Sequence, residues 1–171
     1  MISLEKAKEM LEHQGGVENI EVCKDEWVLA RFANRLNPEK PHNLVVHPIR
    51  EQLIMKIRVP AISTIKHNTE FTRVLANVNY DLVLGKAGVD SRDGEVMFEI
   101  NHPCQDGDAE DPGPEVFARL VEAAMETARD VTLLATHVGM VEAGVPEEVV
   151  KRFLKQFQDE DEDEAEETDT L

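Results

Sequence analysis

Alternating apolar and polar residues near the middle of the chain constrain its fold more than any other feature. Between residues 52 and 59 the side chains alternate with the period of two that an extended strand requires. Lys56 and Arg58 fall on one face of this strand, and the opposite face is apolar: Leu53, Met55, Ile57 and Val59. A strand buried on one side only is typical of antiparallel sheets. The sequence therefore predicts an antiparallel sheet with one face toward solvent.

Further strands are indicated by β-branched and aromatic residues between turn-forming segments. The expected strands are 20–23, 27–32, 44–46, 52–59, 82–89 and 95–100. Residues 47–51, which include Pro48, are expected to form the turn before strand 52–59. Asp93 and Gly94 supply turn chemistry, so strands 82–89 and 95–100 are expected to form a hairpin.

Helices are indicated where apolar residues recur at a spacing near 3.6. Ser3 can cap a first helix that ends at Gly15, and Asn68 or Thr69 can cap a second with an apolar stripe at Phe71, Val74, Leu75 and Val78. The longest helix is expected from Glu115 to Gly144 at the latest, and another from Pro146 with Val149, Phe153 and Phe157 on its apolar side. Helices and strands in this order predict an α+β fold rather than alternating βαβ units.

Acidic residues outnumber basic ones by 35 to 18, which gives a net charge of −17. Nine of these acids and no base lie in residues 159–171, so the rest of the chain carries −8. So dense a run of like charges is expected to be a disordered tail, which either keeps the protein soluble or competes for the basic surfaces of partners. We expect three parts: an α+β domain over 1–144, a C-terminal helix over 145–158 and an acidic tail over 159–171.

Charge and hydropathy exclude several classes of protein. No apolar run approaches the roughly 18 residues of a membrane span, and the first residues do not resemble a signal peptide, so we expect a cytoplasmic protein without a membrane partner. Phosphates of duplex nucleic acid would be repelled by a chain with a pI near 4.7. The same acidity is also compatible with adaptation to high salt.

The sequence contains no catalytic or cofactor-binding motif that we recognise, so we expect no catalytic residue, cofactor or metal. The glycines form neither a phosphate-binding loop nor a dinucleotide fingerprint. His42 and His47 have a spacing seen in metal sites, but an offset of five places them on opposite faces of a strand. Cys104 lies near His102, yet the acids that follow favour a raised thiol pKa and an unreactive side chain.

One modest group of basic residues is a candidate binding surface for an anion. The group consists of Lys56, Arg58 and Lys66, and Arg31 and Arg73 would lie nearby if the strands pair as expected. The candidate surface for the anion is formed by Lys56, Arg58 and Arg73. A solvated sheet face is the simpler interpretation of these residues.

The order of elements and one local signature resemble a known family. Residues 77–80 (Asn-Val-Asn-Tyr) close the second helix, and strand 82–89, the Asp93-Gly94 turn, strand 95–100 and the long helix follow. This arrangement, over residues 3 to 138, resembles the YbjN-type bacterial proteins, which share the type III secretion chaperone-like fold. The resemblance implies an antiparallel sheet with helices packed on one side, frequent dimerisation, and a role in binding other proteins or in regulation. It carries over no catalytic residue.

These observations lead to one functional expectation and one alternative. We expect a non-enzymatic protein-binding module, chaperone-like or regulatory, that holds a segment of a partner protein and acts as a homodimer. The alternative is a small anionic-ligand binder or an enzyme whose site the sequence does not reveal.

Overall fold

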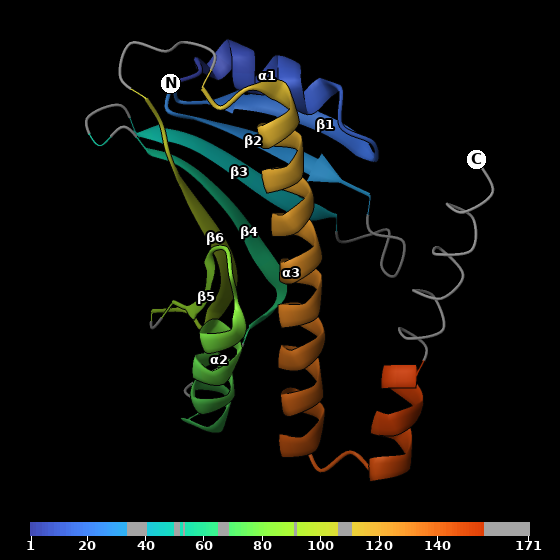
Figure 1. Cartoon of the computed structure of the whole chain (residues 1–171). Helices are drawn as coiled ribbons and strands as arrows, with labels where there is room; N and C mark the ends of the chain where they lie inside the picture. Colours follow the sequence, from blue (N-terminus) through green and yellow to red (C-terminus); the bar gives the residue numbers. More distant parts are fainter. Residues whose placement is uncertain are drawn as a thin grey trace, which may run out of the picture.

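The computed structural model describes residues 1–33, 41–49, 52, 54–64, 69–90, 92–105 and 111–155. Along the chain the elements are α1 (Leu4–Glu12), β1 (Val17–Cys23), β2 (Trp27–Phe32), β3 (His42–Ile49), β4 (Ile54–Thr64), α2 (Thr69–Asp81), β5 (Lys86–Val89), β6 (Glu95–Pro103) and α3 (Pro114–Glu142). Figure 1 shows a twisted sheet with α1, α2 and α3 in front of it. The predicted α+β fold is confirmed.

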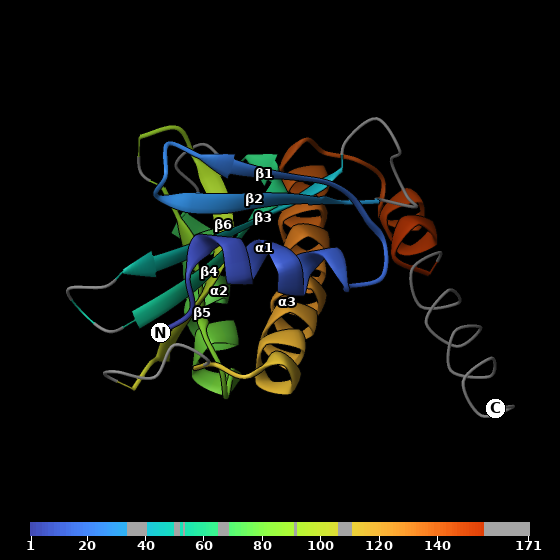
Figure 2. The ribbon, with the colours of Figure 1, turned by 90° about the horizontal axis from the view of Figure 1, so that it is seen from above.

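The six strands form one antiparallel sheet in the order β1-β2-β3-β4-β6-β5. The alternation in β4 has the predicted consequence: Met55, Ile57 and Val59 are fully buried, and Lys56 and Arg58 lie on the other face of the strand. Seen from above in Figure 2, α1 and α3 lie on the same side of the sheet. Helices on one side leave the opposite face, which we call the outer face, uncovered by any described helix.

The core lies between the sheet and the helices. α3 packs against β4 and β6, α1 packs against β1 and β2, and α2 packs against β5. Phe71 of α2, Phe98 of β6 and Phe117 of α3 are the largest fully buried side chains. The predicted cap of α1 is confirmed, because the Ser3 side chain accepts a hydrogen bond from the backbone N–H of Lys6 at 3.1 Å.

The expected turn at 47–51 is wrong for its first three residues. β3 continues through His47, Pro48 and Ile49, which pair with Lys56, Met55 and Ile54 of β4. Pro48 is tolerated because the β2–β3 pairing ends at Val28 and Val46, so the missing N–H of Pro48 interrupts no bond to β2.

The expected strand 82–89 is half the predicted length, since β5 begins only at Lys86. The chain bends at Gly85, whose φ is +79°. A Cβ at this position would lie 2.5 Å from Cζ of Phe98 and 2.7 Å from the carbonyl oxygen of Glu99. Only glycine fits this approach to β6, so Leu82 to Leu84 form a connection and not a strand.

The described chain ends in a second, short helical stretch. α3 stops at Glu142, and Gly144, with φ +70°, allows the chain to turn back into helical residues 147–155. The C-terminal helix that Pro146 predicted is therefore present, and Val150 is its buried residue. The acidic segment 159–171 lies outside the described residues.

Candidate functional site

Charged residues from three adjacent strands meet on the outer face. Arg58 of β4 is paired with Glu99 of β6, and Glu99 is paired with Lys86 of β5. Lys56 lies two residues from Arg58 on the same face of β4. We call Lys56, Arg58 and Lys86 the basic patch.

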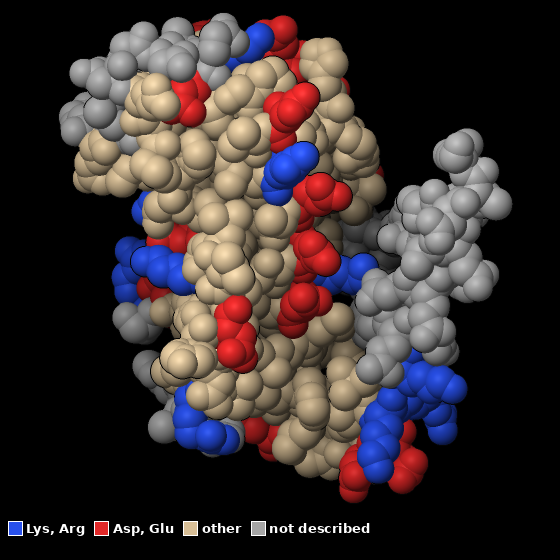
Figure 3. Space-filling view, viewed as in Figure 1, with Lys and Arg blue, Asp and Glu red and all other residues tan. Residues whose placement is uncertain are grey.

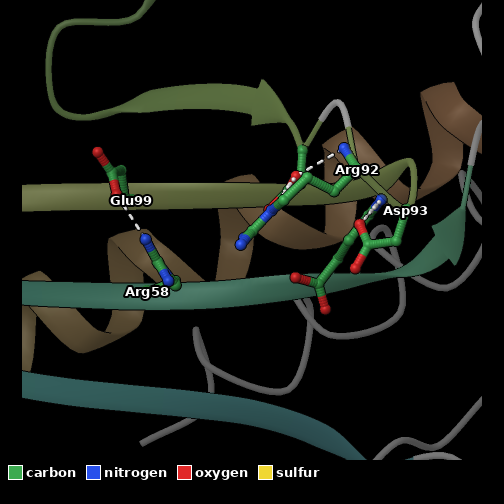
Figure 4. A network of polar contacts seen from close by, with 6 residues as sticks. Arg58, Arg92, Asp93 and Glu99 are labelled. Atoms are coloured by element: carbon green, nitrogen blue, oxygen red, sulfur yellow. Dashed lines mark hydrogen bonds and ion pairs between the residues drawn. The ribbon is translucent and has the colours of Figure 1, made fainter.

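The basic patch surrounds a carboxylate that is nearly buried. The Glu99 side chain is 10% exposed, and its oxygens lie 3.0 Å from Nζ of Lys86 and 3.6 Å from Nζ of Lys56. A terminal guanidinium nitrogen of Arg58 lies 3.6 Å away (Figure 4). Burial raises the pKa of Glu99, but the hydrogen bond from Lys86 and the charges of Lys56, Lys86 and Arg58 outweigh it, so the pKa lies below its ordinary value.

A second ion pair lies beside the patch, in the β5–β6 turn. The Asp90 carboxylate accepts hydrogen bonds from Nε of Arg92 at 3.0 Å and from a terminal nitrogen at 2.5 Å. Asp93 accepts a bond from the backbone N–H of Glu95 at 3.0 Å, which helps to close the turn (Figure 4). The hydrogen bonds from Arg92 hold the pKa of Asp90 at about 2, and the charge of Arg58 contributes in the same direction. Asp90 is thus already matched by Arg92.

The structure separates the basic residues that the sequence grouped together. Lys56 and Arg58 lie together as expected, whereas Arg73 lies on α2, a helix that packs against β5. Arg31 lies on β2, 3.7 Å from Glu21 of β1. Lys66 lies outside the described residues. Sequence reasoning missed Lys86 and Glu99, although the expected hairpin placed both residues on its strands.

The two edges of the sheet differ in whether their backbone groups are available to hydrogen-bond another strand. At the β5 edge, the side-chain amide of Asn79 on α2 donates to the carbonyl of Ala87 at 2.8 Å and accepts from its N–H at 2.7 Å. Ala87 is paired with Phe98 on its other side. The amide of Asn79 therefore takes the place of a neighbouring strand and blocks this edge at its centre.

The β1 edge is open in the described part of the chain. β1 pairs with β2 alone and is the first strand of the sheet. Its residues Ile20 and Val22 lie opposite the core residues Ala30 and Val28, and Val22 is 41% exposed. An extended backbone next to β1 could form main-chain hydrogen bonds and place apolar side chains beside these two residues.

A separate apolar surface follows the end of α2. Tyr80 is 90% exposed, Val83 is fully exposed and Leu84 is 43% exposed. Three large apolar side chains within five residues are unusual for a surface that stays in water.

The remaining candidates from the sequence have structural roles. His42 lies on the α3 side of β3, where burial and then the charge of Arg129 lower its pKa, and His47 lies on the outer face against Trp27. Burial, followed by the charge of Asp111, raises the pKa of the Cys104 thiol, as the sequence indicated. In the described residues no three His, Cys, Asp or Glu side chains are grouped as a metal site needs.

None of the helices that the structure describes combines the length and apolar character needed to span a membrane.

Comparison with known proteins identifies the fold. No protein-family model and no curated protein sequence matches the chain. A chain in the crystal structure of the ExsC–ExsE complex is similar, with a TM-score of 0.55 and 15% sequence identity over 79% of this chain and 97% of that chain. The likeness shows the type III secretion chaperone-like fold that the sequence predicted.

Proposed function

We propose that this protein is a non-enzymatic binding module that holds an extended segment of a partner protein along the edge of β1. The observation that carries the proposal is the difference between the two sheet edges. The edge at β5 is blocked by Asn79, whereas β1 has strand β2 on one side only. An edge of this kind binds an extended chain by strand addition.

The side chains of β1 indicate what such a segment contains. Main-chain hydrogen bonds along β1 do not depend on sequence, so specificity comes from alternate side chains of the segment. Those on the helical side lie next to half-buried Ile20 and exposed Val22, which favour aliphatic or aromatic residues. Those on the outer side lie next to Glu21, which favours basic or neutral polar residues.

The fold is consistent with this role. The similar structure is that of a complex between two proteins, ExsC and ExsE. A chaperone-like or regulatory function in the cytoplasm, a place among the YbjN-type bacterial proteins, and action as a homodimer are parts of the same proposal. Tyr80, Val83 and Leu84 provide the surface that a second copy would cover.

The proposal is tested by partner capture with two matched variants of the full chain. Val22→Lys places a charge on the open edge, where lysine opposes strand pairing. Val141→Lys makes the same change on α3, at a valine that is 57% exposed and remote from β1. We expect the wild type and Val141→Lys to retain the same proteins from native lysate, identified by mass, and Val22→Lys to lose them.

Two outcomes oppose the proposal. Equal retention by Val22→Lys and the wild type would move the binding site away from β1. If no variant retains any protein, the anion-binding alternative gains support, and ligand-induced thermal shifts that disappear in Lys56→Ala/Arg58→Ala would support it. Circular dichroism of both valine variants checks that the sheet is intact.

A further inference from the structure

The basic patch carries more positive charge than its own carboxylate requires. Three cations, Lys56, Arg58 and Lys86, lie within 3.6 Å of the single acid Glu99. Asp90, whose charge interacts with that of Arg58, is held by Arg92. The patch therefore has a surplus of about two positive charges when Glu99 is ionised.

Part of this surplus is available to a second anion. The side chain of Lys86 is 63% exposed and that of Arg58 is 43% exposed. The Nε atom of Arg58 is buried, so the exposed part of the guanidinium that a second anion can reach is its terminal nitrogens. Lysine has three donors and arginine five, so both side chains can bind Glu99 and a second carboxylate together.

The net negative charge of the protein favours an anion that is already attached to the chain over one from solution. An acidic molecule from solution must approach a protein of net charge −17. A tethered acidic segment is also repelled by the rest of the chain, which carries −8, but its effective concentration near the body is on the order of millimolar whatever the concentration of protein, and this offsets part of that cost. This chain ends in such a segment: residues 159–171 contain nine acids and no base.

The face of the molecule drawn in Figure 3 carries acids that repel this acidic segment. Exposed acids lie along α3, at Glu115, Glu122, Glu126 and Asp130, with the exposed base Arg119 among them (Figure 3). In the same view, Lys and Arg side chains gather near β5 and β6, and again on helical residues 147–155. The latter group is Lys151, Arg152 and Lys155, next to the segment in sequence, and is the competing location that an experiment must separate from the patch.

The length of chain after Lys155 is sufficient to reach the patch. Residues 156–171 span up to about 50 Å when extended. A body of this size has a radius of gyration of about 15 Å. The outer face is not covered by any of the described helices, so nothing in that part of the structure bars the approach (Figures 1 and 2).

We propose that the acidic segment 159–171 binds the basic patch of its own chain, on the outer face of the sheet. The bound segment covers Lys56, Arg58 and Lys86, and keeps other acidic ligands off this face until they displace it. The β1 edge takes no part in this contact, so the inference stands or falls independently of the proposed function.

Carbodiimide cross-linking of the full chain tests the contact directly. The reagent joins a lysine amine to a carboxylate that touches it, and mass spectrometry identifies the joined peptides. At low salt we expect Lys56 or Lys86 joined to segment 156–171, at about tenfold the yield for Lys8 of α1, a lysine that is 44% exposed and remote from the patch. Near 1 M salt, where the Debye length is about 3 Å, the yield should approach that of Lys8.

Three results would overturn the proposal. The first is that the carboxylates of the segment are cross-linked only to Lys151 or Lys155. The second is that the cross-linking yield at Lys56 and Lys86 is no higher than the yield at Lys8. The third concerns the origin of the segment. In a mixture of ¹⁵N-labelled and unlabelled protein, peptides joined within one isotope support contact in the same chain, whereas an excess of mixed pairs shows contact between chains.

A second measurement does not depend on cross-linking. In a full-length variant with the nine acids of 159–171 changed to their amides, Lys86 should be acetylated several-fold faster than in the wild type, with Lys8 unchanged. Equal rates for Lys86 in the two proteins would contradict the contact. The contact would also be contradicted if the same concentration of inorganic phosphate protected Lys86 in the wild type and in the amide variant. Phosphate would then meet no competition from the acidic segment at the patch.

Discussion

The side-chain amide of Asn79 hydrogen-bonds both backbone polar groups of Ala87, at 2.8 Å and 2.7 Å. One residue of α2 thereby satisfies the centre of edge strand β5 and fastens the helix to the sheet. This contact explains why the backbone of β5 is blocked from pairing with another strand whereas that of β1 is open. It also gives a structural role to the Asn-Val-Asn-Tyr signature at residues 77–80.

Replacing Asn79 with alanine should free the β5 edge. Two backbone groups of Ala87 lose their partner, and we expect the free energy of unfolding to fall by about 1–3 kcal/mol, measured by urea denaturation. Size-exclusion chromatography should show concentration-dependent association, because the β5 edge becomes available for pairing. Asn77→Ala, on the exposed side of the same helix, is the control and should change neither quantity.

Gly85 should tolerate no side chain. A methyl group there meets Phe98 and the backbone of Glu99 at a positive φ, so Gly85→Ala should lower the free energy of unfolding by about 2–4 kcal/mol. Gly88→Ala, three residues further on in β5, meets nothing within 4 Å and should change the free energy of unfolding by less than about 0.5 kcal/mol. Similar losses in the two variants would show that the bend at Gly85 is not required.

Glu99 should make stability depend on pH in a defined direction. Its pKa is lower in the folded protein than in the unfolded chain, so its contribution is complete above about pH 4.5 and is lost as the pH falls through the lowered value. Glu99→Gln should therefore be less stable than the wild type by about 1–3 kcal/mol at neutral pH, with a smaller difference in acid. Denaturation at pH 7 and pH 3.5 measures both differences, and a constant gap would contradict the assignment.

Arg92 should control the titration of Asp90. The folded-state pKa of about 2 depends chiefly on hydrogen bonds from Arg92, so Arg92→Gln should return it toward 3.8. Because the folded-state pKa is depressed, the stabilising effect is present above pH 3.8 and is lost as the pH falls toward 2. Carboxyl ¹³C chemical shifts of Asp90, followed through a pH titration of the wild type and of Arg92→Gln, report this change.

The proposed homodimer should depend on the apolar surface after α2. Light scattering at micromolar concentration should give twice 19.3 kDa for the wild type. Val83→Glu should give 19.3 kDa, because a charge would be buried between the two copies. Val116→Glu, at a valine of α3 that is 45% exposed, should leave the dimer intact. A wild type of 19.3 kDa would refute the dimer itself.

Local pattern was enough to predict most elements. The period of two in β4, the 3.6-residue spacing in α3 and the Asp93-Gly94 turn each depend on neighbours in the sequence, so they were visible in it. The errors occurred where distant residues decide. Pro48 stays in β3 because β2 has already ended beside it, and residues 82–84 leave the strand because Phe98 lies against Gly85.

By itself the sequence determined an α+β chain, an antiparallel sheet with Lys56 and Arg58 on its solvent face, and an acidic C-terminal segment. Only the tertiary structure decided what those residues meet. Strand pairing brings Lys86 and Glu99 to Arg58, and helix packing sets Asn79 against Ala87. Such contacts depend on strand register and on packing between elements far apart in the chain, which local periodicity does not encode.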